Sequence, residues 1–178
     1  MNYHDITKCD MLNGDGLRVV LWVAGCSHHC KGCQNPQTWD PNGGVLFDDK
    51  AKEELFEALN LNYISGITFS GGDPLYLYHR EEVLGLMKEI KKKFPNKTMW
   101  LYTGFTFEEI IKWPNGEEIL SYLDVLVDGR FILEERDPNL LWVGSPNQRV
   151  IDVQKTLQSS HIIKHCEVYY EKYNGKRY

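Results

Sequence analysis

Residues 25–33 read Gly-Cys-Ser-His-His-Cys-Lys-Gly-Cys, so that Cys26, Cys30 and Cys33 are spaced as C-x-x-x-C-x-x-C. Iron–sulfur clusters with four irons usually take four cysteine thiolates from the protein. Three thiolates in one short loop leave one iron without a protein ligand, and a small molecule can bind and be reduced there. The spacing therefore predicts a catalytic [4Fe-4S] cluster held by these three cysteines, rather than a cluster that only carries electrons.

A structural zinc site is the main alternative for this loop, because His28 and His29 could complete a set of four ligands. Zinc ligands usually come as one C-x-x-C pair and a distant second pair, whereas Cys9 and Cys166 are isolated. We expect both of these to be free buried thiols, and we expect the two histidines to face a partner. A disulfide framework is disfavoured because the chain has 5 cysteines, an odd number.

The composition is that of an ordinary globular protein, with 178 residues, 42% hydrophobic residues and a net charge of −5. The length predicts a single domain over residues 1–178 with its core at about 14–152, and residues 167–178 are left unplaced. The negative charge argues against a nucleic-acid partner. The chain shows no apolar signal region, no membrane-spanning run and no paired cysteines, which together favour a reducing cytoplasm.

The hydrophobic pattern alternates between strands and helices. The apolar run at residues 17–24 predicts a strand that is buried on both faces and ends at the cysteine loop. Further strands are expected at residues 66–69, 97–102, 124–127 and 148–153, and helices at 48–61, 79–94, 107–113, 117–122 and from 153 to about 165. Such alternation predicts an α/β fold with a parallel sheet. The chain is too short for the ~200 residues or more of eight βα units, so we expect a partial, incomplete parallel βα barrel.

Glycine-rich and polar turns follow the predicted strands. The cysteine loop follows the first, Ser70-Gly71-Gly72-Asp73-Pro74 the second, Thr103-Gly104 the third and Asp128-Gly129 the fourth. Ligands of parallel sheets bind beyond the carboxyl ends of the strands. The sequence therefore predicts one ligand site that collects all four turns.

These motifs together resemble the radical S-adenosylmethionine enzymes, and within them the small glycyl-radical activating enzymes. The cysteine loop and the Gly-Gly-acid-Pro turn carry the resemblance to the superfamily. A closer similarity, to the activating proteins of anaerobic ribonucleoside-triphosphate reductase, covers about residues 14–152 and rests on softer motifs: Gly14-Asp15-Gly16-Leu17-Arg18, residues 25–36 with Thr38-Trp39, Tyr102-Thr103-Gly104-Phe105, Val127-Asp128-Gly129-Arg130-Phe131 and Gly144-Ser145-Pro146-Asn147-Gln148-Arg149. This resemblance implies the partial-barrel fold of the superfamily.

The resemblance also implies an oxidoreductase that uses a [4Fe-4S] cluster and S-adenosyl-L-methionine. The reduced cluster would cleave the cofactor to a 5′-deoxyadenosyl radical, which would take a hydrogen from a glycine of the reductase, with no catalytic side chain beyond cluster and cofactor. Cys26, Cys30 and Cys33 would hold the metal. The cofactor would be bound by Gly32, Cys33, Gln34, Ser70, Gly71, Gly72, Asp73, Pro74, Tyr102, Thr103, Asp128 and Arg149.

Several positions depart from the family pattern. Gly32 stands where many members have an aromatic residue near the adenine, Gln34 where the subfamily often has an aromatic residue, and Asp73 where glutamate is more usual. Arg18 is expected to hold the loop before the first strand, and Trp39 to pack on the cysteine loop.

The implied partners are proteins. They are the large glycyl-radical subunit of the reductase and a low-potential electron donor of flavodoxin or ferredoxin type, and a homodimer is left open. Activation of pyruvate formate-lyase or of another glycyl-radical enzyme is the alternative within the same chemistry. A non-catalytic zinc-binding interaction module is the alternative from another class.

Overall fold

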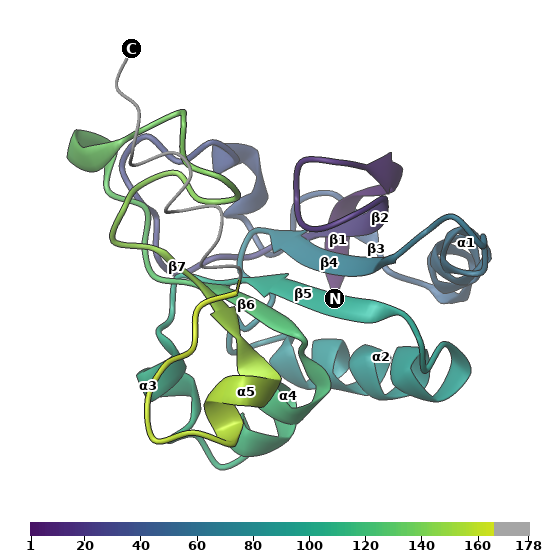
Figure 1. Cartoon of the computed structure of the whole chain (residues 1–178). Coiled ribbons are helices and arrows are strands. Elements are labelled where there is room, and N and C mark those ends of the chain that lie inside the picture. The colour runs from purple at the N-terminus through teal and green to yellow at the C-terminus, as the bar shows by residue number, and fades with distance from the viewer. Residues whose placement is uncertain (166–178) are drawn as a thin grey trace.

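The structure, a computed structural model, describes residues 1–165 and is a seven-stranded mixed sheet with helices (Figure 1). The strand order is β3-β1-β2-β4-β5-β6-β7, so the sheet is open, with β3 and β7 at its edges. The strands are β1 (Asn2–Asp10), β2 (Arg18–Val23), β3 (Val45–Leu46), β4 (Gly66–Gly71), β5 (Thr98–Tyr102), β6 (Val125–Asp128) and β7 (Arg149–Asp152). The helices are α1 (Asp49–Leu59), α2 (Arg80–Lys93), α3 (Phe107–Ile110), α4 (Gly116–Tyr122) and α5 (Val153–Leu157), with short 3₁₀ turns at Pro36–Thr38 and Leu133–Glu135.

The central four strands, β2, β4, β5 and β6, are parallel and neighbours, as the alternating pattern predicts. Their side chains are almost all buried, which explains why they read as continuous apolar runs. The helices α1, α2 and α4 lie between successive parallel strands, and the predicted stripe of α2 is buried at Val83, Leu86, Met87 and Ile90. Among the described residues, no helix is long and apolar enough to cross a membrane.

The expectation of a parallel sheet is wrong at both edges. β1 and β3 pair antiparallel beside β2, and β7 pairs antiparallel with β6. β1 gives no apolar signal because Ile6 is its only buried residue. β7 was expected as a strand, but the segment before it, residues 129–148, is a loop with one short 3₁₀ turn rather than a crossover helix, and such a connection lets the strand return antiparallel.

A buried arginine fastens the parallel strands at their amino ends. Arg18 is 0% exposed and donates through Nε to Thr68 Oγ1 at 2.7 Å, through Nη1 to Thr98 Oγ1 at 2.9 Å and through Nη2 to the Ile67 carbonyl at 2.6 Å. It also donates to the Asp15 carbonyl at 3.1 Å, so it does hold the loop before β2, as expected. Burial lowers its pKa to about 10, which leaves the guanidinium charged at pH 7.

Replacing Arg18 by lysine tests this fastening. Arg18→Lys keeps a charge but loses the planar fork, so several buried acceptors lose their donor. We expect the free energy of unfolding, measured by urea denaturation, to fall by about 2 kcal/mol. The control is Arg80→Lys. The Arg80 guanidinium lies 4.8 Å from the centre of the Trp113 ring, outside the Arg18 network, and we expect this substitution to change the free energy of unfolding by less than ~0.5 kcal/mol. Equal effects of the two substitutions would contradict the assignment.

Candidate functional site

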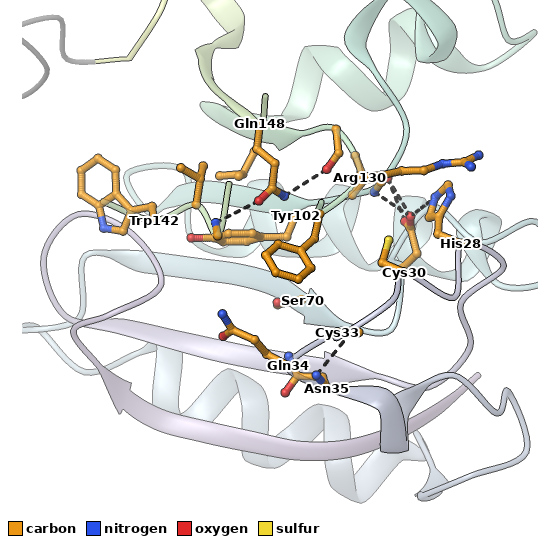
Figure 2. A pocket seen from close by; sticks show the side chains of 18 of the residues that line it. His28, Cys30, Cys33, Gln34, Asn35, Ser70, Tyr102, Arg130, Trp142 and Gln148 are labelled. Atoms are coloured by element: carbon orange, nitrogen blue, oxygen red, sulfur yellow. Dashed lines mark hydrogen bonds and ion pairs between the residues drawn. The ribbon is translucent and has the colours of Figure 1, made fainter. Parts of the chain in front are cut away.

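A cavity of about 530 Å³ lies beyond the carboxyl ends of the parallel strands. Figure 1 shows the loop after β2 and the loop after β6 gathered at this end of the sheet. The cavity is lined by those two loops and by the turns after β4 and β5 (Figure 2). The four turns that the sequence predicts to converge therefore do so, although Asp128 itself lies outside the lining. The volume is within the ~300–1,000 Å³ usual for small-molecule sites.

The cysteine loop brings Cys26, Cys30 and Cys33 to one wall of this cavity. Its entry is pinned to the following segment, because the Gly25 N–H donates to the Thr38 carbonyl at 2.8 Å and the Cys26 N–H to the Trp39 carbonyl at 3.1 Å. The Trp39 ring lies 4.9 Å from that of His29, so Trp39 packs on the loop as expected. Cys9, by contrast, is exposed on β1, and the expectation that it is buried is wrong. Cys166 and residues 167–178 lie outside the described residues.

The donor set of the loop, three cysteine thiols at one wall of the cavity, fits an iron–sulfur cluster. Among residues 1–165, no three His, Cys, Asp or Glu side chains converge on one point. Zinc needs its ligands about 2.3 Å from one point, whereas a four-iron cluster gives each thiolate its own iron. Burial raises the pKa of Cys26 to about 11 and also raises that of Cys30, so iron binding must displace the thiol protons.

The Gly-Gly turn after β4 lies directly against the cysteine loop. The Gly72 N–H donates to the Val23 carbonyl and the Asp73 N–H to the Gly25 carbonyl, each at 2.8 Å. A Cβ on Gly72 would come within 2.4 Å of the Gly25 carbonyl oxygen and 2.8 Å of the Thr38 oxygen. Only glycine therefore allows the two backbones to approach in this way.

The Asp73 carboxylate is buried and joins three loops. It accepts hydrogen bonds from the Leu75 N–H at 2.9 Å, the Thr103 hydroxyl at 2.9 Å and the Gly104 N–H at 3.0 Å. His28 Nε2, from the cysteine loop, lies 2.8 Å from the same carboxylate, a close polar contact without hydrogen-bond alignment. His28 is thus buried against Asp73 with its ring 4.5 Å from that of Phe105, and the expectation that it faces a partner is wrong.

The structure brings most of the sequence-predicted cofactor residues to the cavity, but not all. Those that line it are Cys33, Gln34, Ser70, Gly71, Gly72, Asp73, Tyr102 and Thr103. Figure 2 shows Gln34, Ser70 and Tyr102 around the same space, although they come from three different elements. Tyr102 is partly buried, and desolvation raises the pKa of its hydroxyl. The remaining predicted residues, Gly32, Pro74, Asp128 and Arg149, do not line the cavity.

Gly32 lies outside the cavity lining, where the cysteine loop meets Leu133 of the loop after β6. It adopts φ +70°, and a Cβ there would meet Leu133 at 2.7 Å. Lys31 pairs beside it with Glu134 at 3.0 Å. Leu133 therefore covers the position at which the family more often has an aromatic residue.

Asp128 and Arg149 bind each other instead of facing the cavity. Arg149 Nε donates to Asp128 Oδ1 at 2.9 Å, while its Nη1 and Nη2 donate to Glu108 at 2.9 and 2.7 Å. The other oxygen of Asp128 accepts the Phe107 N–H at 2.8 Å. These contacts join β6, β7 and α3. The Asp128 carboxylate and the Arg149 guanidinium, which the sequence predicts to bind the cofactor, are therefore already engaged by other residues of the protein.

The sequence prediction gave no role to Gln148, which closes the loop of residues 129–148. Its Oε1 accepts the Gly144 N–H at 2.9 Å and its Nε2 donates to the Gly129 carbonyl at 3.0 Å (Figure 2). The buried Ser145 hydroxyl accepts the Ile132 N–H and donates to Asn147. The motif at residues 144–149, to which the sequence gave no physical role, is the signal from which the role of Gln148 could have been inferred.

The fold and the three-cysteine cavity define an iron–sulfur protein, and comparison with known proteins agrees. A family model described as a 4Fe-4S single cluster domain matches residues 12–151. The chain is 46% identical over 151 residues to the anaerobic ribonucleoside-triphosphate reductase-activating protein of Enterobacteria phage T4, covering 84% of this chain and 93% of that protein. Proteins of the same name from Haemophilus influenzae and Escherichia coli K12 are 42% and 38% identical over 150 and 154 residues, covering 83% and 84% of this chain and 96% and 97% of theirs. The chain belongs to the family of anaerobic ribonucleoside-triphosphate reductase-activating proteins.

Asp73→Asn tests the junction of the three loops. The two carboxylate oxygens accept the Leu75 and Gly104 N–H groups, one each. In asparagine one of these oxygens becomes an NH₂ group, so one of the two buried N–H donors loses its acceptor. We expect the free energy of unfolding to fall by about 2 kcal/mol in urea titrations of the cluster-free protein. Asp124→Asn is the control, because that carboxylate accepts the Met99 N–H through Oδ2 at 2.8 Å and an asparagine oxygen can replace it. A loss no larger than that of the control would contradict the role given to Asp73.

Glu108→Gln tests the Arg149 ion pairs through pH. The hydrogen bonds from Arg149 lower the pKa of Glu108 from 4.5 to about 2. A lowered folded-state pKa contributes stability above pH 4.5, and this stability is lost as the pH falls through 2. We expect Glu108→Gln to cost about 0.5 kcal/mol in urea denaturation at pH 7, because the pair is half exposed, and nothing near pH 2. Glu53→Gln, on the exposed side of α1, is the control for the loss of one surface carboxylate, and a difference for Glu108→Gln that stays constant over this pH range would contradict the pairing.

Proposed function

We propose that this chain is the activase of an anaerobic ribonucleoside-triphosphate reductase, an oxidoreductase that generates the glycyl radical of that enzyme. The supporting observation is a single cavity that gathers three cysteines of one loop and a glycine turn of the next strand, in a chain of this family. The three-cysteine loop accounts for a cluster with one iron open to a small molecule.

Each group of cavity residues has a distinct task in this proposal. Cys26, Cys30 and Cys33 hold the [4Fe-4S] cluster. Gly71 and Gly72 let the turn after β4 pack closely on β2 and on the cysteine loop, so that its backbone lines the space for S-adenosyl-L-methionine. When bound, cluster and cofactor supply one-electron cleavage to a 5′-deoxyadenosyl radical, the hard chemistry that the protein itself cannot perform.

Polar groups around the same space orient the cofactor. They are the Ser70 and Thr103 side chains, the Gln34 amide and the Tyr102 ring. We assign Asp73 to positioning, because its carboxylate already contacts its own turn after β4, the turn after β5 and His28 of the cysteine loop. Asp128 and Arg149 are likewise used by each other, so we assign them to the frame of the site, and we assign no cofactor contact to Gly32 and Pro74, which lie outside the cavity lining.

We infer that the open sheet is the partial barrel of the radical S-adenosylmethionine enzymes, formed as a single domain with its core at about 14–152. The four parallel strands and the open edges support this assignment. An open sheet leaves side access to the cavity, which suits a protein substrate. The proposal places the chain in the cytoplasm, with the large glycyl-radical subunit as partner, a flavodoxin- or ferredoxin-type donor as electron source and a homodimer as one assembly to test.

Electron paramagnetic resonance tests the function directly. The protein is reconstituted anaerobically with iron and sulfide, then mixed with reductant, S-adenosyl-L-methionine and the anaerobic reductase. We expect a glycyl-radical doublet that is lost in Cys30→Ala, because the cluster loses a ligand, and retained in Cys9→Ala, because Cys9 is exposed on β1. Formation of 5′-deoxyadenosine without a doublet would reject the reductase as substrate. Bound zinc without acid-labile sulfide would reject the cluster.

A further inference from the structure

His79 is a buried histidine at the amino end of α2, only 4% exposed. Its Nε2 lies 2.8 Å from the backbone carbonyl oxygen of Asp73. A carbonyl can only accept a hydrogen bond, so Nε2 carries the proton and donates it. Desolvation lowers the pKa of His79, which keeps the ring neutral at pH 7 with this single N–H. His79 is therefore a neutral donor directed at the glycine-rich turn after β4.

Two features make histidine an unfavourable choice at this position unless the bond to Asp73 is needed. A buried imidazole destabilises the fold unless its N–H is hydrogen-bonded, whereas leucine or phenylalanine would fill the space without a partner. His79 also occupies the N-cap of α2 and makes no side-chain cap hydrogen bond, although serine, threonine, aspartate or asparagine would stabilise the helix there. Neither packing nor helix capping explains this side chain, and the bond to Asp73 does.

The bond from His79 completes the hydrogen bonding of a tight turn at residues 73–76. The Tyr76 N–H donates to the same Asp73 carbonyl at 2.9 Å, so both lone pairs of that oxygen are used. Within the turn, the Asp73 carboxylate accepts the Leu75 N–H at 2.9 Å. The His79 N–H donates to the Tyr76 carbonyl at 3.1 Å. The side chain and the backbone of His79 thus both tie the turn to α2.

The same turn reaches the ligand cavity and the start of the cysteine loop. Gly72 and Asp73 line the cavity, and the Asp73 N–H donates to the Gly25 carbonyl at 2.8 Å. The Tyr76 ring lies 5.5 Å from that of His79 and packs on Gly25, where a Cβ would come within 2.9 Å of it. A shift of the Asp73 carbonyl would therefore move the cavity wall and the entry of the cysteine loop together.

We propose that His79 is a positioning residue for cofactor binding, which fixes the Asp73 carbonyl and so keeps the turn after β4 in the shape that S-adenosyl-L-methionine requires. His79 is outside the cavity lining and acts through the turn. Without this donor, a fraction of the molecules would hold the turn in other shapes, and the apparent affinity would fall with the fraction that remains competent. The role in cofactor binding rests on the proposed function, whereas the effect on the turn does not.

Hydrogen–deuterium exchange of the cluster-free protein tests the effect on the turn. His79→Phe keeps a ring without a donor, and His79→Gln returns an amide N–H near the place of Nε2. His161→Phe is the control, because His161 is exposed, lies 2.9 Å from Ser159 Oγ and is outside the cavity lining. We expect the amides of residues 70–76 to exchange about fivefold faster in His79→Phe, and to stay within about twofold of the unsubstituted protein in His79→Gln and the control.

The amides of α4, at residues 116–122, report in the same experiment on opening of the whole fold. Equal acceleration in α4 and in the turn would overturn the positioning role, because His79→Phe would then only destabilise the protein. Unchanged exchange of residues 70–76 in His79→Phe would overturn it as well.

The Kd of S-adenosyl-L-methionine, measured by calorimetry on cluster-loaded proteins of equal iron and sulfide content, tests the role in cofactor binding. We expect this Kd to rise about fivefold in His79→Phe and to return to within about twofold in His79→Gln. An unchanged Kd in His79→Phe, or a glutamine variant as weak as the phenylalanine variant, would overturn the role. If the unsubstituted protein binds no S-adenosyl-L-methionine, the proposed function fails, and the exchange measurement still decides whether His79 holds the turn.

Discussion

The carboxylate of Asp73 is the contact on which the geometry of the site depends. It lies in the turn after β4, accepts from the turn after β5 and touches His28 of the cysteine loop. The three segments are separated by tens of residues in the sequence, and none of them has regular secondary structure of its own at this point. A buried carboxylate with all of its oxygens used is costly to rearrange, so it fixes the loops relative to one another.

The sheet supplies the positions that this carboxylate joins. Parallel pairing of β2, β4 and β5 brings their carboxyl ends to one edge, and each strand delivers one loop there. Arg18 fastens the same strands at their amino ends, through Thr68 and Thr98. A charged network thus lies at each end of the parallel strands, one that stabilises the frame and one that arranges the site.

Local sequence patterns were sufficient to predict the cysteine loop, the Gly-Gly turn and the four parallel strands. Cysteine spacing, the position of glycines and runs of buried apolar residues can all be read from a short stretch of sequence. β1 could not be predicted, because a single buried residue leaves no periodic signal. The ion pair between Asp128 and Arg149 could not be predicted, because it depends on β7 pairing antiparallel with β6. His28 was misjudged for a related reason: nothing near it in the sequence reveals the buried carboxylate that it meets.

Gln148 closes the loop of residues 129–148 at its base, where β6 ends and β7 begins. The register of these two strands therefore does not depend on how many residues the middle of the loop contains. Insertions or deletions at residues 134–142 would alter the wall of the cavity and leave the sheet intact, since lengthening a closed loop costs little entropy. Evolution can thus change this wall of the cavity while the cysteine loop and the sheet remain as they are.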